Sequence, residues 1–262
     1  DFRDPWTDID FYHKLKLTRL ADKKHRQLEK KVLSTADYLV TVSRGCAEGL
    51  LKIGNRKIEV VTNGYDPSDY EFEKPGLDKT FTISHFGAFN KDRNPVALWL
   101  AMDELATENP DFRNLLRIKL YGQTDASVIN DIKKHNLTDN LVIIEHLPHQ
   151  KGLVELCKSQ VLLLPLNNTP NVKGILTGKM FEYIALQRPI LAIGPTDADF
   201  AEILRETNSG ISLNFDDLPG IKNALQNYFN LFNENKLMVK PGAYEKYSRK
   251  NLAKQFVNLI QP

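Results

Sequence analysis

The sequence predicts an α/β protein with a doubly wound parallel sheet, and three observations support this fold class. Short runs rich in Val, Ile and Leu recur without polar alternation, which is typical of strands buried on both faces. Amphipathic stretches of helical period separate them, which indicates helices covering a parallel sheet. With 262 residues, of which 42% are hydrophobic, the chain is long enough for one large domain or two small ones.

Apolar runs mark the expected strands, two of them before residue 64 and six after residue 80. They are Tyr38–Val42, Ile58–Thr62, Phe81–Phe86, Leu116–Tyr121, Leu141–Ile144, Val161–Pro165, Ile190–Ile193 and Gly210–Leu213. Helical spacing of apolar residues predicts helices at Pro95–Thr107, Lys179–Leu186 and Ala243–Ile260. Six strands suffice for a complete Rossmann-like domain, whereas two strands do not.

Turn residues concentrated at Asn63–Pro67 and Lys74–Gly76 place a domain boundary near residue 75. We expect residues 1–75 to be part of a second Rossmann-like domain with the passage between domains. We expect residues 76–240 to form the complete Rossmann-like domain and residues 241–262 to form a C-terminal helix. Because the chain opens at Asp1 without an initiator Met, we expect it to be a piece of a longer protein.

Composition excludes several classes of function. With 35 Lys and Arg against 33 Asp and Glu, the chain lacks the basic excess of a nucleic-acid binder. Cys46 and Cys157 cannot form a disulfide framework, so we expect a reducing, cytoplasmic location. The six His and two Cys show no metal-ligand spacing, so no metal site is expected. The longest apolar run, Val161–Leu166, is far shorter than the ~20 residues of a membrane span.

The predicted sheet places two loops at one crevice. In the strand order 3-2-1-4-5-6, ligands bind outside the carboxyl ends of strands 1 and 4, where the order reverses. Strand 1 of the large domain ends at Gly87 and strand 4 ends at Pro165. We therefore expect the loop from Gly87 to Pro95 to meet the loop Leu166–Thr177.

Each of these loops leads to a cation where a helix begins, Arg93 in one and Lys179 in the other. A helix N-terminus offers unpaired N–H groups to an anion, and Thr177-Gly178 lets the backbone approach it closely. Glu182, about one turn further on, suits a ribose diol. The set predicts a nucleoside diphosphate site.

Each residue of this set also has an ordinary interpretation. Arg93 and Lys179 can be solvated cations, and Glu182 can be an acid that complements the helix dipole. Gly87 and Gly178 can serve only as turn residues. Only their joint position at the switch point favours the nucleotide site.

Along nearly its whole length, the chain resembles retaining glycosyltransferases of family four, which have the two-domain GT-B fold. The specific matches are KGILTGKMFEYIALQRPILAI (Lys173–Ile193) and SRGCAEGLLKIGNRKIEVVTNGYDP (Ser43–Pro67). Ser84–Met102, Leu147–Pro165 and the bacterial-type DFRDPW segment at Asp1–Trp6 are also similar to that family.

The resemblance implies a nucleotide-sugar donor held mainly by residues 76–240, with no obligatory metal and no other cofactor. It implies transfer of the sugar, with retention, to a glycan or lipid-linked acceptor in cell-surface polysaccharide biosynthesis. It places Arg93 and Lys179 on the diphosphate, Glu182 on the ribose, and the backbone near Leu147 against the base. No catalytic residue is assigned.

One departure concerns the Glu-x7-Glu pattern of the family, because the position eight residues before Glu182 is Gly174. We expect the backbone N–H groups of Gly174 and Ile175 to replace the missing acid. Two alternatives stay open: a nucleotide-sugar epimerase of the same architecture, and an inert domain that binds a nucleotide or a partner. The chain by itself is expected to be inactive, since half of the cleft is absent from it.

Two further segments have alternative interpretations. The resemblance places Arg3 and Asp4 at a strand end facing the cleft, whereas a local salt bridge between them is the simpler expectation. The segment His13–Lys31 carries eight basic residues and two acids, Asp22 and Glu29. Its spacing predicts a basic amphipathic helix, which suits either an anionic membrane surface or a solvated face.

Overall fold

A parallel sheet of six strands forms the centre of the protein, seen in a computed structural model that describes residues 1–240 and 242–261. The strand order is β5-β4-β3-β6-β7-β8, which is the predicted order 3-2-1-4-5-6. The bounds match the predicted runs: β3 Phe81–Phe86, β4 Leu116–Tyr121, β5 Leu141–Ile144, β6 Val161–Pro165, β7 Ile190–Ile193 and β8 Gly210–Leu213. The predicted fold class is therefore confirmed.

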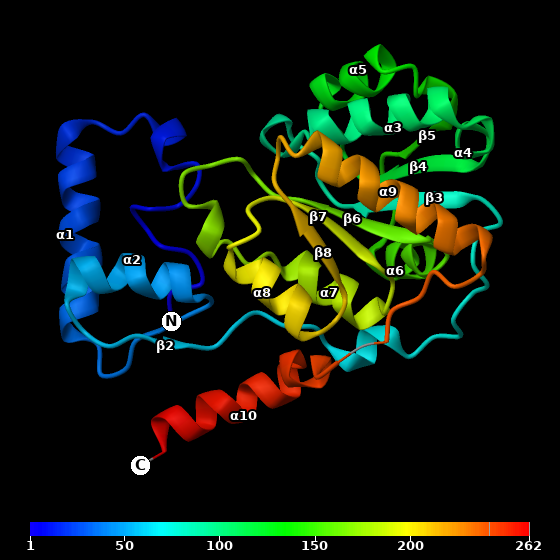
Figure 1. The fold of residues 1–262 in the computed structure, drawn as a ribbon. Coiled ribbons are helices and arrows are strands. Elements are labelled where there is room, and N and C mark those ends of the chain that lie inside the picture. Colours follow the sequence, from blue (N-terminus) through cyan, green and yellow to red (C-terminus); the bar gives the residue numbers. More distant parts are fainter. Residues whose placement is uncertain (241, 262) are drawn as a thin grey trace.

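Helices cover both faces of this sheet, as Figure 1 shows. One face carries α3 Val96–Glu108, α4 Pro110–Leu115, α5 Ala126–Lys134 and α9 Leu218–Asn233, and the other carries α6 His149–Cys157, α7 Gly178–Leu186 and α8 Asp199–Glu206. Aromatic rings fill the first layer, where Phe112 and Phe229 lie 5.1 Å apart between ring centroids. All five residues of β6 are buried, which explains its unbroken apolar sequence.

The N-terminal part is a smaller α/β unit. It contains α1 Arg19–Thr35, β1 Val40–Thr41, α2 Arg44–Gly54 and β2 Glu59–Val60, and the two strands pair in parallel. The predicted strands are therefore present but shorter. β1 ends where Ser43 begins the next helix, since its side chain accepts a hydrogen bond from the N–H of Cys46.

Two predicted helices are interrupted by capping residues. His13–Lys31 is not one helix, because Lys16 adopts a left-handed conformation with φ 48° and Thr18 caps α1. A 3-10 turn, Tyr12–Leu15, precedes this break. Within Ala243–Ile260, Ser248 is extended and caps α10, Arg249–Ile260. The remaining 3-10 turns are Pro67–Tyr70, Lys91–Arg93, Thr138–Asn140, Val172–Gly174 and Tyr244–Tyr247.

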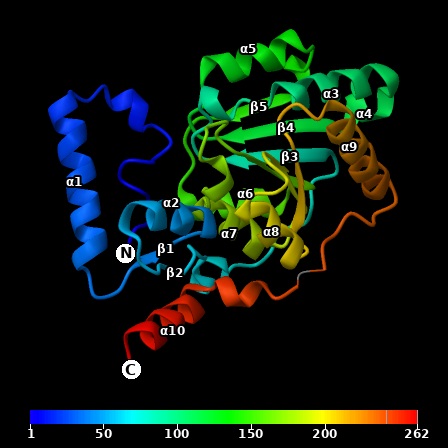
Figure 2. The ribbon, with the colours of Figure 1, turned by 60° about the vertical axis from the view of Figure 1, so that its left-hand side comes forward.

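Helix α10 runs back beneath the sheet to the N-terminal part, so both ends of the chain lie on that side of the molecule (Figures 1 and 2). Its Leu252 is 7% exposed and packs with Val40 and Val61, and Phe256 and Leu259 pack against this cluster. The C-terminal helix therefore stabilises the small unit rather than the six-stranded sheet. The division at residues 75 and 240 stays a prediction.

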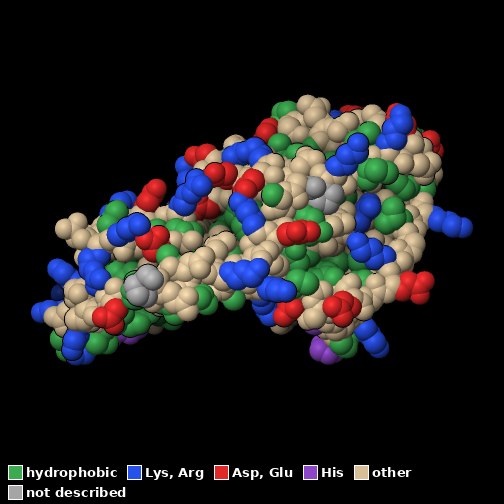
Figure 3. All heavy atoms as spheres, turned by 90° about the horizontal axis from the view of Figure 1, so that it is seen from below, with side chains coloured by type: hydrophobic (Ala, Val, Ile, Leu, Met, Phe, Trp, Pro, Cys, Tyr) green, Lys and Arg blue, Asp and Glu red, His purple; other side chains and the backbone are tan. Residues whose placement is uncertain are grey.

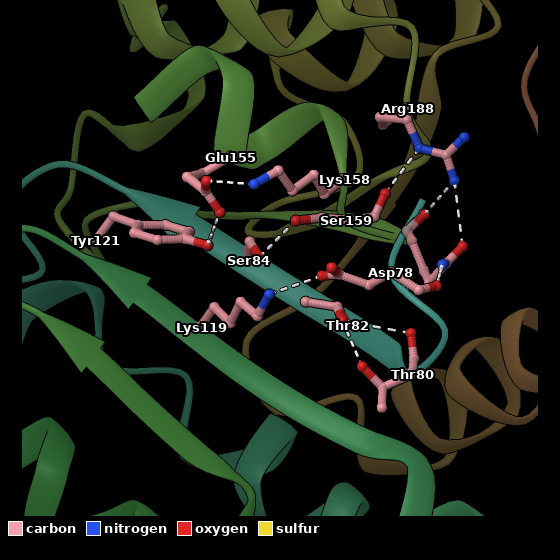
Figure 4. Close-up of polar contacts among 11 residues, drawn as sticks. Asp78, Thr80, Thr82, Ser84, Lys119, Tyr121, Glu155, Lys158, Ser159 and Arg188 are labelled. Carbon is pink, nitrogen blue, oxygen red and sulfur yellow. Dashed lines mark hydrogen bonds and ion pairs between the residues drawn. The ribbon is translucent and has the colours of Figure 1, made fainter. Parts of the chain in front are cut away.

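A partly buried set of polar contacts lies where the chain enters β3 (Figure 4). Lys119 Nζ bonds Asp78 Oδ2 at 2.7 Å, and Ser159 Oγ donates to Ser84 Oγ at 2.6 Å. Arg188 Nε donates to the carbonyl of Ser159 at 2.8 Å. Each of these polar groups has a hydrogen-bond partner within the protein. The contacts therefore hold the starts of β3 and β6 together.

The surface carries both charges. Seen from below, Lys and Arg side chains are interspersed with Asp and Glu over the visible face (Figure 3). No helix in the described ranges 1–240 and 242–261 is long and apolar enough to cross a membrane.

Candidate functional site

The loops that follow β3 and β6 meet at the carboxyl ends of these strands, as predicted. The N–H of Asn168 donates to the carbonyl of Asp92 at 3.0 Å. Arg93 Nε donates to Asn167 Oδ1 at 2.8 Å. The two segments are therefore joined through main chain and side chain at the switch point of the sheet.

Gly87 begins the first loop, and both its backbone conformation and its surroundings require a glycine. Its φ is 104°, and a Cβ added there would lie 3.0 Å from Lys179 Nζ. Phe89, fully buried against His85 with 4.7 Å between ring centroids, anchors the rest of this loop in the core. Because Gly87 has no side chain, the ammonium group of Lys179 can lie directly against its backbone.

A buried histidine holds Lys179 in this position. His85 is 1% exposed, and its Nδ1 lies 3.0 Å from the carbonyl of Leu163, which can only accept. Burial lowers the pKa of His85 well below its usual value, so the ring is neutral with the proton on Nδ1. Its Nε2 therefore accepts a hydrogen bond from Lys179 Nζ at 3.0 Å.

Arg93 lies close enough to Lys179 to make the charged form of that lysine less favourable. Burial, and then repulsion by Arg93, lowers the pKa of Lys179 to about 7, while Glu182 opposes the shift. Burial also lowers the pKa of Arg93. Neither cation forms an ion pair with a carboxylate among the residues that the structure describes. An anionic ligand would complete this arrangement.

The first turn of α7 is open to such a ligand. A Cβ added at Gly178 would meet nothing within 4 Å. Thr177 begins the helix without a capping hydrogen bond from its side chain, and its buried Oγ1 has no partner within the described chain. The first N–H groups of a helix have no intrahelical acceptor, so they are free for anion oxygens.

Glu182, predicted to hold the ribose, lies beside the loop after β5. Its Oε1 is 3.1 Å from His149 Nε2, and Phe86 lies under that ring with 6.1 Å between centroids. Leu147 is half-buried against the core beneath α6 and α7. Glu182, predicted to bind the ribose, therefore lies near Leu147, predicted to contact the base. His149 packs on Phe86 and also contacts Glu182.

A cavity of about 290 Å³ lies between this site and the N-terminal segment. Its lining includes Arg3, Asp4, Asp10, Asn63, Arg93, Asn167, Asn171, Gly174, Thr177 and Gly178. Arg3 forms its salt bridge with Asp1, at 2.9 Å, instead of with Asp4. Arg3 and Asp4 both line the cavity. The sequence did not predict Asp10, Asn167 and Asn171 as site residues. Their contacts join segments on the two sides of the cleft, which no local pattern reports.

Gly174 lies in the cavity wall, but the expected role of its backbone is wrong. The N–H of Gly174 donates to the carbonyl of Asn171, and that of Ile175 donates to Val172, both at 3.1 Å. These bonds close the 3-10 turn η5, Val172–Gly174. Neither N–H group is free to replace the missing acid.

The basic segment His13–Lys31 lies at the outer side of the small unit. Its two acids are engaged: Asp22 bonds Arg26 at 3.0 Å, and buried Glu29 accepts from the N–H of Trp6 at 2.9 Å. Leu20 is 82% exposed. Lys14 forms an ion pair with Asp92, which ties this segment to the first loop of the site.

One Rossmann-like sheet that faces a second α/β unit across a cleft is the GT-B class of fold. Sucrose-phosphate synthase from Thermosynechococcus elongatus is similar over 98% of this chain and 65% of that chain, with 15% identity and a TM-score of 0.68. WaaG, a glycosyltransferase involved in lipopolysaccharide biosynthesis, matches over 97% of this chain and 70% of its own, with 12% identity and a TM-score of 0.66.

The G117R mutant of S. aureus TarM, solved with fondaparinux, α-GlcNAc-glycerol and UDP, is similar over 94% of this chain and 48% of its own. Its identity is 11% and its TM-score 0.65. The chain thus spans about half to seven-tenths of the length of these proteins. The sequence matches no protein-family model and no curated protein. These similarities establish the fold.

Proposed function

We propose that the chain binds a nucleotide-diphosphate sugar at the carboxyl ends of β3 and β6 and is part of a glycosyltransferase. The sugar is transferred, with retention and without an obligatory metal, to a glycan or lipid-linked acceptor. The GT-B fold supports this function, since WaaG and sucrose-phosphate synthase share it.

One observation carries the proposal: Lys179 and Arg93 lie together, partly buried, beside the open N-terminus of α7. Partial burial of two cations that form no direct ion pair with the described residues costs free energy, and a bound anion would offset that cost. A diphosphate fits, because Arg93 can bind oxygens as a fork and Lys179 as a point charge. Glu182, which lies beside His149, would bind the ribose.

The same groups have a role in the reaction. As the bond between the sugar and the diphosphate breaks, negative charge develops on the leaving diphosphate. Lys179, Arg93 and the helix N-terminus are held in advance around that charge. Removal of one such donor in other enzymes slows the reaction by about 10²–10³-fold.

Titration calorimetry with UDP and GDP tests the site. We expect Lys179→Ala and Arg93→Ala each to weaken binding by at least about tenfold, as for loss of a charged hydrogen bond. Lys91→Ala is the matched control, since Lys91 is exposed in the same loop. Absence of binding to both UDP and GDP, or equal binding by all four proteins, would contradict the proposal. A nucleotide-sugar epimerase would interconvert the donor in the absence of an acceptor.

Contact of His13–Lys31 with an anionic membrane surface is a further part of this proposal. It is supported by the exposure of Leu20 and by the engagement of both acids within the protein. Sedimentation with vesicles of anionic and of neutral lipid tests it, and equal sedimentation with both would contradict it.

A further inference from the structure

Gly174 lines the cavity at the position where the family pattern has an acid, and Asp10 of the N-terminal segment lines the same cavity. We infer that Asp10 supplies the carboxylate that contacts hydroxyl groups of the donor sugar, so that the N-terminal segment recognises the sugar. This inference rests on the proposed function, because it assumes that a nucleotide sugar occupies the cleft.

Position 174 has no room for an acid. A Cβ added to Gly174 would lie 3.0 Å from the N of Cys46, and one added to Gly45 would lie 2.6 Å from the Cα of Gly174. The start of α2 is therefore packed directly on the turn η5. The carboxylate has to come from another segment.

Asp10 is connected to the diphosphate-binding cation through a single side chain. Its Oδ2 accepts from Asn167 Nδ2 at 2.5 Å, and Asn167 Oδ1 accepts from Arg93 Nε at 2.8 Å. The other carboxylate oxygen of Asp10 makes no hydrogen bond within residues 1–240 and 242–261. Asp10 thus lines the cavity next to the place where the diphosphate would end and the sugar would begin.

The surroundings of Asp10 suit a neutral polyhydroxylated ring. The amides of Asn63, Asn167 and Asn171 line the cavity; within the described chain each donates one N–H, to Leu176, Asp10 and Asp8 respectively, and keeps a second N–H for a ligand. Ile9 and Ile175 add apolar surface. Hydroxyl groups both donate and accept, so a carboxylate beside amides can orient them. The volume of about 290 Å³ is at the low end of small-molecule pockets, which fits one monosaccharide unit.

The test compares each nucleotide with its sugar. Calorimetry on the 262-residue chain uses UDP, UDP-glucose, UDP-N-acetylglucosamine, GDP and GDP-mannose, with Asp10→Asn and Asp8→Asn. Asp8 lies in the same segment but outside the cavity lining, so it is the matched control. We expect Asp10→Asn to weaken binding of the preferred nucleotide sugar by about 10–100-fold, the range for a charged hydrogen bond.

Binding of the bare nucleotide separates sugar contact from a structural role. Asp10→Asn removes a negative charge near the diphosphate, so UDP or GDP should bind equally well or slightly better. Equal weakening of nucleotide and nucleotide sugar would mean that Asp10 only positions Arg93, and unchanged binding of both would also overturn the inference. Failure of the unaltered chain to bind UDP or GDP would instead reject the proposed function. If UDP or GDP binds, but none of the three nucleotide sugars binds more tightly than its bare nucleotide, the sugar contact is rejected and the nucleotide site is kept.

Discussion

At the scale of single residues, Lys179 combines properties that a purely structural lysine lacks. It is partly buried, its hydrogen-bond partner is the neutral ring of His85, and the cation Arg93 is near. A lysine with these neighbours releases its proton easily, because burial and Arg93 outweigh the partial compensation from Glu182. A bound diphosphate would reverse this effect.

Proton uptake on binding is the first consequence. The pKa of Lys179 is about 7 without ligand, so at pH 8 most molecules carry a neutral amine, and binding of a diphosphate should take up close to one proton. Affinity should therefore fall between pH 7.5 and 9, by at most about tenfold per unit. Calorimetry in buffers of different ionisation enthalpy measures the uptake.

The variant Lys179→Arg serves as the control for this uptake, because a guanidinium stays charged throughout this pH range. Proton uptake equal to that of the unaltered chain would show that another group titrates. Without ligand, the folded chain holds the Lys179 proton more weakly than the unfolded chain. This group therefore makes the free energy of unfolding rise with pH between about 7 and its usual 10.5.

Gly87 and Gly178 form a matched pair of glycines within one site. Gly87→Ala should destabilise the protein by about 1–3 kcal/mol, because φ is positive there, and should weaken nucleotide binding by displacing Lys179. Gly178→Ala has open space and an ordinary helical conformation, so stability should change little. Urea unfolding measures both, and an equal loss of stability would contradict the structure.

At the scale of elements, the packing of α2 on η5 joins the small unit to the large one. Their contact is built from two glycines, Gly45 and Gly174, and Cys46 Sγ lies 3.6 Å from the carbonyl of Gly174. Backbones that approach this closely leave no volume for a side chain. The same contact excludes the acid of the Glu-x7-Glu pattern.

Gly174→Ala tests this contact. The added methyl group would meet the N of Cys46 at 3.0 Å, so we expect a loss of about 1–3 kcal/mol in the free energy of unfolding. Gly76→Ala is the control, since its Cβ would meet nothing within 4 Å. A Gly174→Ala protein as stable as the control would show that α2 and η5 are not in tight contact.

At the scale of the whole molecule, the chain crosses between its two units more than once. The linker leads from the small unit to β3, and α10 returns and packs on β1 through Leu252. The small unit has a sheet of only two strands, each two residues long. Such a unit needs added apolar burial for stability, and α10 supplies it.

Leu252→Ala should therefore destabilise the small unit selectively. Truncation of a buried leucine costs about 2–5 kcal/mol. Hydrogen exchange should show faster exchange of β1 and β2, while β3 and β6 keep their protection. Lys250→Ala, on the exposed side of α10, is the control. Uniform loss of protection over both units would contradict an effect limited to the small unit.

The strands and helices of the large domain could be predicted from the sequence because each depends mainly on the pattern of residues next to one another in the chain. Each strand of the six-stranded sheet contains apolar residues that stand out against the turns around it, although β4 also contains Arg117 and Lys119. Helices α7 and α8 show a regular apolar period. Parallel order then places the carboxyl ends of β3 and β6 together, which was enough to bring Arg93 near Lys179. Composition and order along the chain determined this much.

Tertiary structure alone decided how the cleft is completed. The ring of His85 under Lys179, the exclusion of an acid at Gly174, and the reach of Asp10 to Asn167 each join residues distant in sequence. The helix breaks at Lys16 and Ser248 depended on single capping and left-handed residues that apolar periodicity does not register. Periodicity reports which face of an element is buried, whereas the chemistry of a cleft depends on which elements meet across it.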